Sequence, residues 1–213
     1  MYEVYLFDLD GTLLDTLDDL AAAVNAALKA YGLSPRTKQE VRAFVGNGIK
    51  NLIERAIGEK NHPNFSGVFD EFKRYYKAHC KDATKPYAGV LELLQELNER
   101  GKKCAVVSNK ADFAVQELSK EYFGELIAFS VGENESAGIA KKPAPDMVLK
   151  ALDALGANKK NAVYIGDSEV DLQTAQNAGL PCISVTWGFK DEEFLIAHGA
   201  KTLVDEPREI LKI

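Results

Sequence analysis

The sequence predicts an α/β protein in which a parallel β-sheet carries helices on both faces and an all-helical segment follows the first strand. Two observations support this prediction. From residue 87 onward, short apolar runs rich in Val and Ile alternate with amphipathic helical runs, which is typical of a parallel α/β sheet. Between the first strand-like run and residue 84, only helical patterns occur. We therefore expect residues 1–15 and 84–213 to form a sheet domain and residues 16–83 to form an inserted helical domain.

The N-terminal part of the chain begins with a strand signal and continues with helix signals. Residues 2–8, YEVYLFD, combine aromatic and β-branched side chains and predict a buried strand. Apolar side chains then recur at helical spacing from Thr16, the expected N-cap, to Gly32, the expected stop. Further helical patterns cover residues 38–45, 48–57 and 65–80. We place the hinges between the two domains at residues 13–15 and 82–87.

The C-terminal part alternates between helix and strand signals. Helical periodicity covers residues 89–101, 111–123, 144–156, 169–179 and 191–199. Strand signals cover residues 103–108, 126–132, 161–167, 181–187 and 201–206. Short apolar strands separated by helical patterns predict βαβ units, so these strands and the first one are expected to lie in one sheet.

Composition and charge argue against several functional classes. With 46% hydrophobic and 27% charged residues, the 213-residue chain has the composition of a globular protein. A net charge of −6 opposes nucleic-acid binding, which depends on Lys and Arg side chains that neutralise phosphates. No apolar run approaches the roughly 20 residues of a membrane span, and the N-terminus has no signal-peptide pattern. The three cysteines form no C-x-x-C pair, which favours a reducing cytoplasm over disulfides or a zinc site.

Basic residues are concentrated in the expected helical domain. Residues 16–83 carry 11 basic and 8 acidic side chains, whereas the chain as a whole is acidic. Two interpretations stay open: a chance excess on solvated helix faces, or a basic lid that attracts an anionic substrate to an acidic site.

Acidic residues follow the first expected strand, in the segment LFDLDGTLLD of residues 6–15. Asp8 and Asp10 are two positions apart, so their side chains point the same way on an extended chain. Their like charges repel unless a cation lies between them. Gly11 permits a turn whose N–H groups could bind phosphate oxygens, and Thr12 adds a hydroxyl. The alternative is an Asp-Gly turn with a purely structural role.

Two further groups of polar residues follow apolar segments. Ser108 and Asn109 come after the expected strand of residues 103–108, where they could hydrogen-bond a phosphate oxygen or cap a helix. Lys142 precedes a proline, which disfavours the α conformation at this lysine and holds it extended. Its ammonium could balance carboxylate and phosphate charges, or it could be a surface lysine. Lys141 is the competing choice.

A fourth group lies in GDSEVD, residues 166–171. Asp167 ends a buried strand, and Asp171 lies four residues later on one face of the following helix. Such acids suit Mg²⁺, which binds oxygen ligands, although the dipole of a helix also favours acids in its first turn. Ligands bind at the carboxyl ends of parallel strands. We therefore expect the four groups to meet around Mg²⁺ and a phosphate, with one carboxylate placed to attack phosphorus.

These motifs, in this order, resemble those of the haloacid dehalogenase superfamily, and in particular of its phosphatases. The matching residues are Asp8-Leu9-Asp10-Gly11-Thr12, Ser108, Lys142, and Gly166-Asp167 with Asp171. The helical insertion is similar to a C1-type cap, and its likeness to bacterial phosphoglycolate phosphatases is carried by Gly46, Asn47, Gly48 and Arg55. The resemblance covers the whole core and implies a Rossmann-like parallel-sheet core with an inserted all-helical cap domain.

The resemblance also implies a mechanism. Asp8 would be the nucleophile that forms an aspartyl-phosphate, and Asp10 would be the acid for the leaving alcohol and then the base for water. Ser108 and Lys142 would bind the phosphoryl group. Mg²⁺ would be held by Asp8, Asp167, the backbone carbonyl of Asp10, and Asp171 directly or through water.

Substrate contacts are implied as well, for Thr12, Asn109, Gly46, Asn47 and Arg55. In the cap, three basic side chains could meet a substrate carboxylate: Arg42, Lys50 and Arg55. The expected substrate is a small anionic phosphomonoester, with 2-phosphoglycolate as the first candidate. The expected protein is a cytoplasmic monomer or homodimer that binds neither nucleic acid nor membrane.

Other functions stay open at this point. A phosphosugar mutase resembling β-phosphoglucomutase, or a nucleotide or pyrophosphate phosphatase, would use the same core. A non-catalytic phospho-acceptor switch also gathers acids, a hydroxyl and a lysine at strand ends, but a receiver domain has no lid like residues 16–83. Asp10 favours phosphoryl transfer over dehalogenation, because a leaving halide needs no acid.

Overall fold

The sheet predicted from the sequence is present in the computed structural model, which describes residues 2–134 and 138–213. Its strands are β1 (Val4–Phe7), β4 (Lys103–Ala111), β5 (Phe129–Glu133), β6 (Ala162–Gly166), β7 (Cys182–Val185) and β8 (Leu203–Val204). Within the described residues these six strands are parallel and follow the order β5-β4-β1-β6-β7-β8. The predicted α/β fold is confirmed, with strand ends that shift by a few residues.

Helices cover both faces of this sheet, which is why its strands are apolar throughout. The helices are α5 (Val90–Glu99), α6 (Asp112–Phe123), α7 (Asp146–Ala154), α8 (Glu169–Ala178) and α9 (Glu192–Ala197), and the 3₁₀ turns are η1 (Gly124–Leu126), η3 (Lys159–Asn161) and η4 (Pro207–Lys212). Alternate strand residues face opposite layers. Tyr5 and Phe7 belong to the apolar cluster that includes α5 and α6, whereas Leu6 and Tyr164 belong to the one that includes α7 and α8.

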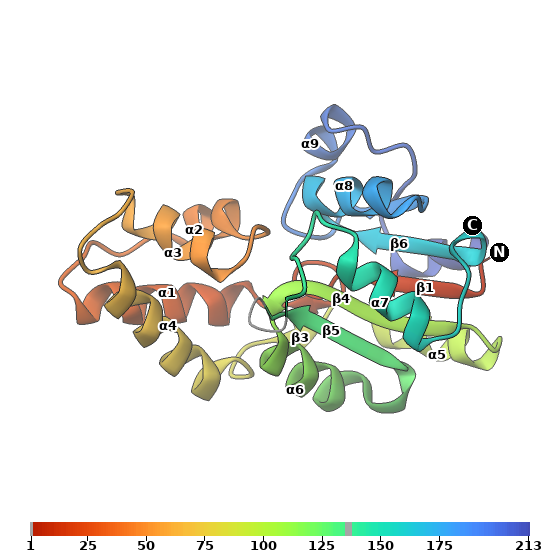
Figure 1. Ribbon diagram of the computed structural model, residues 1–213, viewed down its shortest axis with the longest axis horizontal. Helices are drawn as coiled ribbons and strands as arrows, with labels where there is room; N and C mark the ends of the chain where they lie inside the picture. Colours follow the sequence, from red (N-terminus) through yellow and green to blue (C-terminus); the bar gives the residue numbers. More distant parts are fainter. Residues whose placement is uncertain (1, 135–137) are drawn as a thin grey trace.

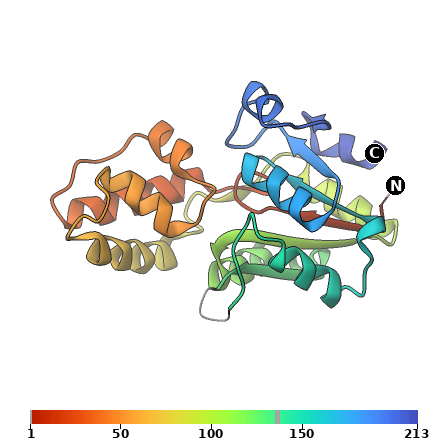
Figure 2. The same cartoon turned by 45° about the horizontal axis from the view of Figure 1, so that its top comes forward.

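The inserted segment is helical, as its periodicity predicts. Its helices are α1 (Leu17–Ala30), α2 (Lys38–Phe44), α3 (Ile49–Ile57) and α4 (Phe65–His79). Figure 1 shows them as a separate group beside the sheet domain, at the end toward which β1 and β6 point. The rotated view in Figure 2 shows the same separation. This group, which we call the cap, therefore stands over the carboxyl ends of the strands.

Two very short strands join the cap to the sheet domain. β2 (Leu14–Asp15) and β3 (Lys85–Pro86) pair antiparallel, so the chain enters and leaves the cap at one place. Asp19 stabilises this junction, because its carboxylate accepts hydrogen bonds from the backbone N–H groups of Ala83 and Thr84. The pairing supports a division of the chain at residues 15 and 84, which stays our proposal.

None of the helices in the described ranges has both the length and the apolar character that crossing a membrane requires.

Candidate active site

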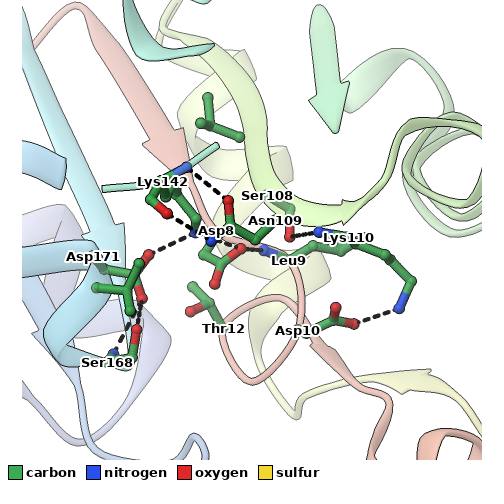
Figure 3. A network of polar contacts seen from close by, with 12 residues as sticks. Asp8, Leu9, Asp10, Thr12, Ser108, Asn109, Lys110, Lys142, Ser168 and Asp171 are labelled. Atoms are coloured by element: carbon green, nitrogen blue, oxygen red, sulfur yellow. Dashed lines mark hydrogen bonds and ion pairs between the residues drawn. The ribbon is translucent and has the colours of Figure 1, made fainter. Parts of the chain in front are cut away.

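The four groups of polar residues come together at the carboxyl edge of the sheet. Asp8 follows β1, Ser108 lies in the last part of β4, and Asp167 follows β6. Because β1 lies between β4 and β6 in the sheet, these strand ends are neighbours. Lys142 reaches the same place from the segment before α7. Figure 3 shows the side chains converging from these separate elements.

Lys142 is the central cation of this arrangement. Its Nζ lies 3.0 Å from Oδ1 of Asp8 and 2.7 Å from Oδ1 of Asp171, and it donates a hydrogen bond to the Tyr164 hydroxyl. Burial alone would lower the pKa of Lys142, but the charges of Asp171 and Asp8 raise it well above its usual value. The lysine therefore stays protonated beside the acids. The sequence left Lys141 as a competitor, and these contacts are made by Lys142.

The acids form a buried cluster that suits a cation. Asp8, Asp167 and Asp171 each offer a carboxylate oxygen within 4.8 Å of the others. Burial, together with the neighbouring acids, raises the pKa of Asp8 to about 6 and that of Asp167 well above its usual value. These raised pKa values indicate that the protein alone does not fully offset the negative charges of the ionised carboxylates.

The donor atoms indicate which kind of cation would fit this cluster. The carboxylates of Asp8, Asp10, Asp167 and Asp171 outnumber the ammonium groups of Lys110 and Lys142, which contact them, and of Lys190, which lines the same cavity. An excess of acids with an all-oxygen donor set suits a hard ion such as Mg²⁺.

Two glycines shape the space around Asp167. A Cβ on Gly11 or on Gly188 would collide with the Asp167 carboxylate, so both positions need glycine. Gly11 also has a φ of +87°, which L-residues with side chains rarely adopt. The carboxylate accepts hydrogen bonds from the Phe189 N–H and from the Thr12 hydroxyl. Thr12, expected to contact the substrate, thus orients an expected metal ligand instead.

Asp171 differs from Asp167 in how its oxygens are used. Its Oδ1 faces Lys142 and Tyr164, and its Oδ2 accepts hydrogen bonds from the backbone and hydroxyl groups of Ser168. Both oxygens therefore already have protein partners. The sequence left open whether Asp171 meets a metal directly or through water, and this geometry favours water.

Asp10 is held by two residues that the sequence did not assign to it. Thr16 was expected to cap α1, but its side chain makes no capping hydrogen bond and donates to Oδ1 of Asp10 at 2.7 Å. Lys110 donates to the same oxygen at 2.8 Å. A sequence signal for Lys110 existed, since a lysine that continues a buried strand needs a charged partner.

The cavity between the sheet edge and the cap has a volume of about 50 Å³. The sheet side of its lining is polar and includes Asp8, Asp10, Ser108, Asn109, Lys110, Asp167 and Lys190. The cap side is formed by Leu20, Val45, Gly46, Gly48, Ile49, Leu52, Phe72 and Tyr76. No lysine or arginine among the described cap residues lines it. The cap wall of this cavity is apolar apart from the Tyr76 hydroxyl and backbone groups, so a basic lid could act on an anion only from outside the lining.

Some of the cap residues that were expected to contact the substrate line the cavity, and others do not. Gly46 lines the cavity, whereas Asn47, Lys50 and Arg55 do not. Arg55 is exposed, and its guanidinium donates to the carbonyl of Phe44 at 2.8 Å. Arg55 and Asn47 thus lie outside the lining of the cavity, and their contact with substrate stays a prediction. The sequence suggested these contacts because the cap motif resembles that of bacterial phosphoglycolate phosphatases. The direction in which each side chain points depends instead on how α3 packs.

Three hydrogen bonds hold the cap closed over the cavity. Nη2 of Arg42 donates to the carbonyl of Gly188 at 2.9 Å, so Arg42 fastens the cap and does not line the cavity. Nδ2 of Asn109 donates to the carbonyl of Gly46 at 3.1 Å. Nζ of Lys110 donates to the Tyr76 hydroxyl at 2.5 Å. Asn109, expected at the substrate, lines the cavity while its amide joins Gly46 to the backbone of Lys142.

Comparison with known proteins agrees with this site. The model of the family described as haloacid dehalogenase-like hydrolase matches residues 5–185. An N-acetylmuramic acid 6-phosphate phosphatase of Pseudomonas aeruginosa is 33% identical over 98% of this chain and 92% of its own. A phosphoglycolate phosphatase of Aquifex aeolicus is 34% identical over 87% of this chain and 85% of its own.

A solved structure shows the same architecture. A protein from Lactobacillus delbrueckii subsp. bulgaricus, described as a candidate phosphoglycolate phosphatase, is 36% identical and superposes with a TM-score of 0.92. The match covers 98% of this chain and 96% of that one. The similarity therefore includes both the sheet domain and the cap.

Proposed function

The chain belongs to the haloacid dehalogenase-like hydrolase family, and we propose that it is a Mg²⁺-dependent phosphatase of small anionic phosphomonoesters, with 2-phosphoglycolate as the first candidate substrate. One observation carries this proposal. Asp8, Asp167 and Asp171 form a buried cluster beside Lys142, and a divalent cation bound by these acids would offset their charge when a phosphate dianion enters.

Asp8 has the position that a nucleophile needs. Its Oδ1 is held by the N–H of Leu9 and by Lys142, and the side chain lines the cavity. Attack on phosphorus forms the Asp8 O–P bond and breaks the bond between phosphorus and the ester oxygen. Lys142 and the Ser108 hydroxyl neutralise and orient the phosphoryl oxygens, which supplies most of the catalysis in such transfers.

Asp10 has the position that the proton donor needs. It lines the same cavity, two residues from Asp8. Its proton goes to the ester oxygen and the free alcohol leaves. The same carboxylate then takes a proton from the water that hydrolyses the aspartyl-phosphate.

The residues present fit Mg²⁺. Asp8 and Asp167 offer carboxylate oxygens to it, the backbone carbonyl of Asp10 is a third candidate ligand, and Asp171 would act through a water. When bound, the ion supplies charge neutralisation for the phosphoryl group and for the clustered acids.

The cavity supports a small substrate. With the cap in this position, the centres of water-sized molecules have only about 50 Å³ open to them in the cavity, which favours a leaving group of a few atoms. A phosphosugar mutase must also hold a second phosphate on the leaving-group side, where the described cap wall is apolar. The apolar cap wall favours a phosphatase over the mutase, and the narrow cavity favours a small ester such as 2-phosphoglycolate.

A phosphate-release screen tests the proposal. Purified protein is assayed with Mg²⁺ on 2-phosphoglycolate, N-acetylmuramic acid 6-phosphate, hexose phosphates, nucleotides and pyrophosphate, ranked by kcat/KM. We expect 2-phosphoglycolate or another small ester to rank first, with activity lost on chelation. Absence of phosphate release from every compound would refute the phosphatase assignment, and preference for a sugar phosphate would refute the substrate class.

A further inference from the structure

Lys110 is a buried lysine of the site. Neither the predicted motifs nor the mechanism above assigns it a role. It lies near the end of β4, and its side chain is 2% exposed. Burying an ammonium is costly unless charged and polar partners replace its water. Asp10 and Tyr76 are those partners, because the carboxylate of Asp10 and the hydroxyl of Tyr76 lie 2.8 and 2.5 Å from Nζ of Lys110.

The two partners of Lys110 come from different domains. Its Nζ lies 2.8 Å from Oδ1 of Asp10, in the loop after β1, and Figure 3 shows it reaching that carboxylate. The same Nζ lies 2.5 Å from the hydroxyl of Tyr76 on α4 of the cap, and 4.7 Å from the centre of that ring. The contact with Asp10 lies within the sheet domain, whereas the contact with Tyr76 exists only while the cap is closed.

Both hydrogen bonds to the Asp10 carboxylate fall on one oxygen. Oδ1 accepts from Lys110 and from the Thr16 hydroxyl, and no hydrogen bond to Oδ2 is found among the described residues. Two donors on one oxygen fix the plane of the carboxylate. Oδ2 is then the oxygen available to exchange a proton with the leaving group in the cavity.

We propose that Lys110 is a positioning residue that orients Asp10 for proton transfer to the leaving alcohol, and that Tyr76 completes this arrangement when the cap closes. The proposal rests on the phosphatase function above. In the step concerned, the Asp8 O–P bond forms, the ester P–O bond breaks, and the proton of Asp10 passes from Oδ2 to the ester oxygen. Lys110 gains and loses no proton.

This role makes a prediction that a structural role does not. An alkoxide leaves poorly without a proton, whereas the acetate of acetyl phosphate leaves without one. The two substrates are matched in size, since acetyl phosphate and 2-phosphoglycolate each carry a two-carbon group. The value of kcat/KM reports steps up to the first irreversible one, formation of the aspartyl-phosphate, so the later water step does not obscure the comparison.

The experiment compares kcat/KM for these two substrates in four forms of the full-length protein: wild type, Lys110→Met, Tyr76→Phe and Lys103→Met. Lys103 is the matched control, because it is at the opposite end of β4 and contacts the carbonyl of Leu155. For Lys110→Met we expect a loss of roughly 10- to 100-fold on 2-phosphoglycolate and less than about threefold on acetyl phosphate. Tyr76→Phe should shift the same ratio by about threefold or more. Lys103→Met should leave it unchanged.

Several outcomes would overturn the proposal. Equal losses on both substrates would show that Lys110 is only structural, and no loss would show that it is dispensable. If Lys110→Met does not fold, Tyr76→Phe decides, because it removes a single hydroxyl: an unchanged ratio then rejects the link to the cap. A wild-type protein that releases phosphate from no compound of the screen above would refute the phosphatase function itself, which separates the two failures.

Discussion

Nζ of Lys142 lies 2.7 Å from Oδ1 of Asp171, in an ion pair whose two side chains are 1% and 0% exposed. Because Ser168 occupies the other oxygen of Asp171, this acid is better suited to hold Lys142 than to bind a metal. The site therefore has two layers. Asp8 and Asp167 would face a bound metal ion, and Asp171 holds Lys142, the lysine that we propose neutralises the phosphoryl group.

The first prediction distinguishes the acids that would bind the metal from the acid that holds Lys142. Asp171→Asn should lower kcat/KM by roughly 10- to 100-fold while leaving the Mg²⁺ concentration for half-maximal activity nearly unchanged. Asp167→Asn should raise that Mg²⁺ concentration by a similar factor. The measurement is a Mg²⁺ titration of activity for both variants. An equal shift in the two titrations would mean that Asp171 is a direct ligand.

The second prediction concerns the nucleophile. Asp8→Asn should reduce turnover by at least about 10³-fold, because the amide has no anionic oxygen to attack phosphorus. The fold should be kept, since Asn has the same shape and removes one of the repelling charges. Phosphate release and circular dichroism check the two parts. Retained turnover in a folded variant would assign the attack to another group.

The third prediction concerns pH and metal. In the protein without metal, burial raises the pKa of Asp8 from 3.8 to about 6 and that of Asp167 well above its usual value. The native state then binds more protons than the unfolded state, so the free energy of unfolding falls as pH rises from about 4 through about 6. Mg²⁺ replaces those protons, so its stabilising effect should grow with pH.

Thermal unfolding with and without Mg²⁺ measures this effect. At a concentration of 100 times Kd, binding contributes about 2.7 kcal/mol, or roughly 5–10 °C in Tm for a chain of this size. We expect that rise near pH 7.5 and a much smaller one near pH 5. An equal rise at both values would contradict it. Asp8→Asn is the control and should reduce the difference.

The fourth prediction compares two cap arginines. Arg42→Gln removes the hydrogen bond to the Gly188 carbonyl and should raise KM by roughly fivefold, the equivalent of about 1 kcal/mol. Arg55→Gln should change kcat and KM by less than about twofold, because the exposed Arg55 contacts only the cap carbonyl of Phe44. Steady-state kinetics on the best substrate measure both. A large KM increase in Arg55→Gln alone would restore the expectation that this arginine binds substrate.

The elements of the fold and the core of the site could be predicted because they depend on local pattern. Short apolar runs rich in β-branched and aromatic residues distinguish β1 and β6, a helical period distinguishes α1 to α4, and acids at strand ends have few structural uses. The cap contacts could not be predicted in the same way. Whether Arg55 points to the cavity or to Phe44 depends on how α2 and α3 pack, and no local pattern encodes that packing.

Thr16 and Lys110 show that the same limit of sequence-based prediction applies inside the site. Thr16 occupies the N-cap position that the sequence predicts, but its hydroxyl donates a hydrogen bond to Asp10, six residues earlier. Lys110 is 100 residues from Asp10 and 34 from Tyr76, and only folding brings the three together. A long-range partner is invisible in a single sequence unless its residue type is unusual for its place.

The sequence by itself determined the sheet domain, the helical cap and the four groups of polar residues that meet at the strand ends. It could do so because strand direction and side-chain alternation follow from covalent geometry and burial. Only the tertiary structure decided which acid faces Lys142, which lysine reaches Asp10 and which cap side chains wall the cavity. Those choices depend on distances between segments far apart in the chain, and only the packed core fixes such distances.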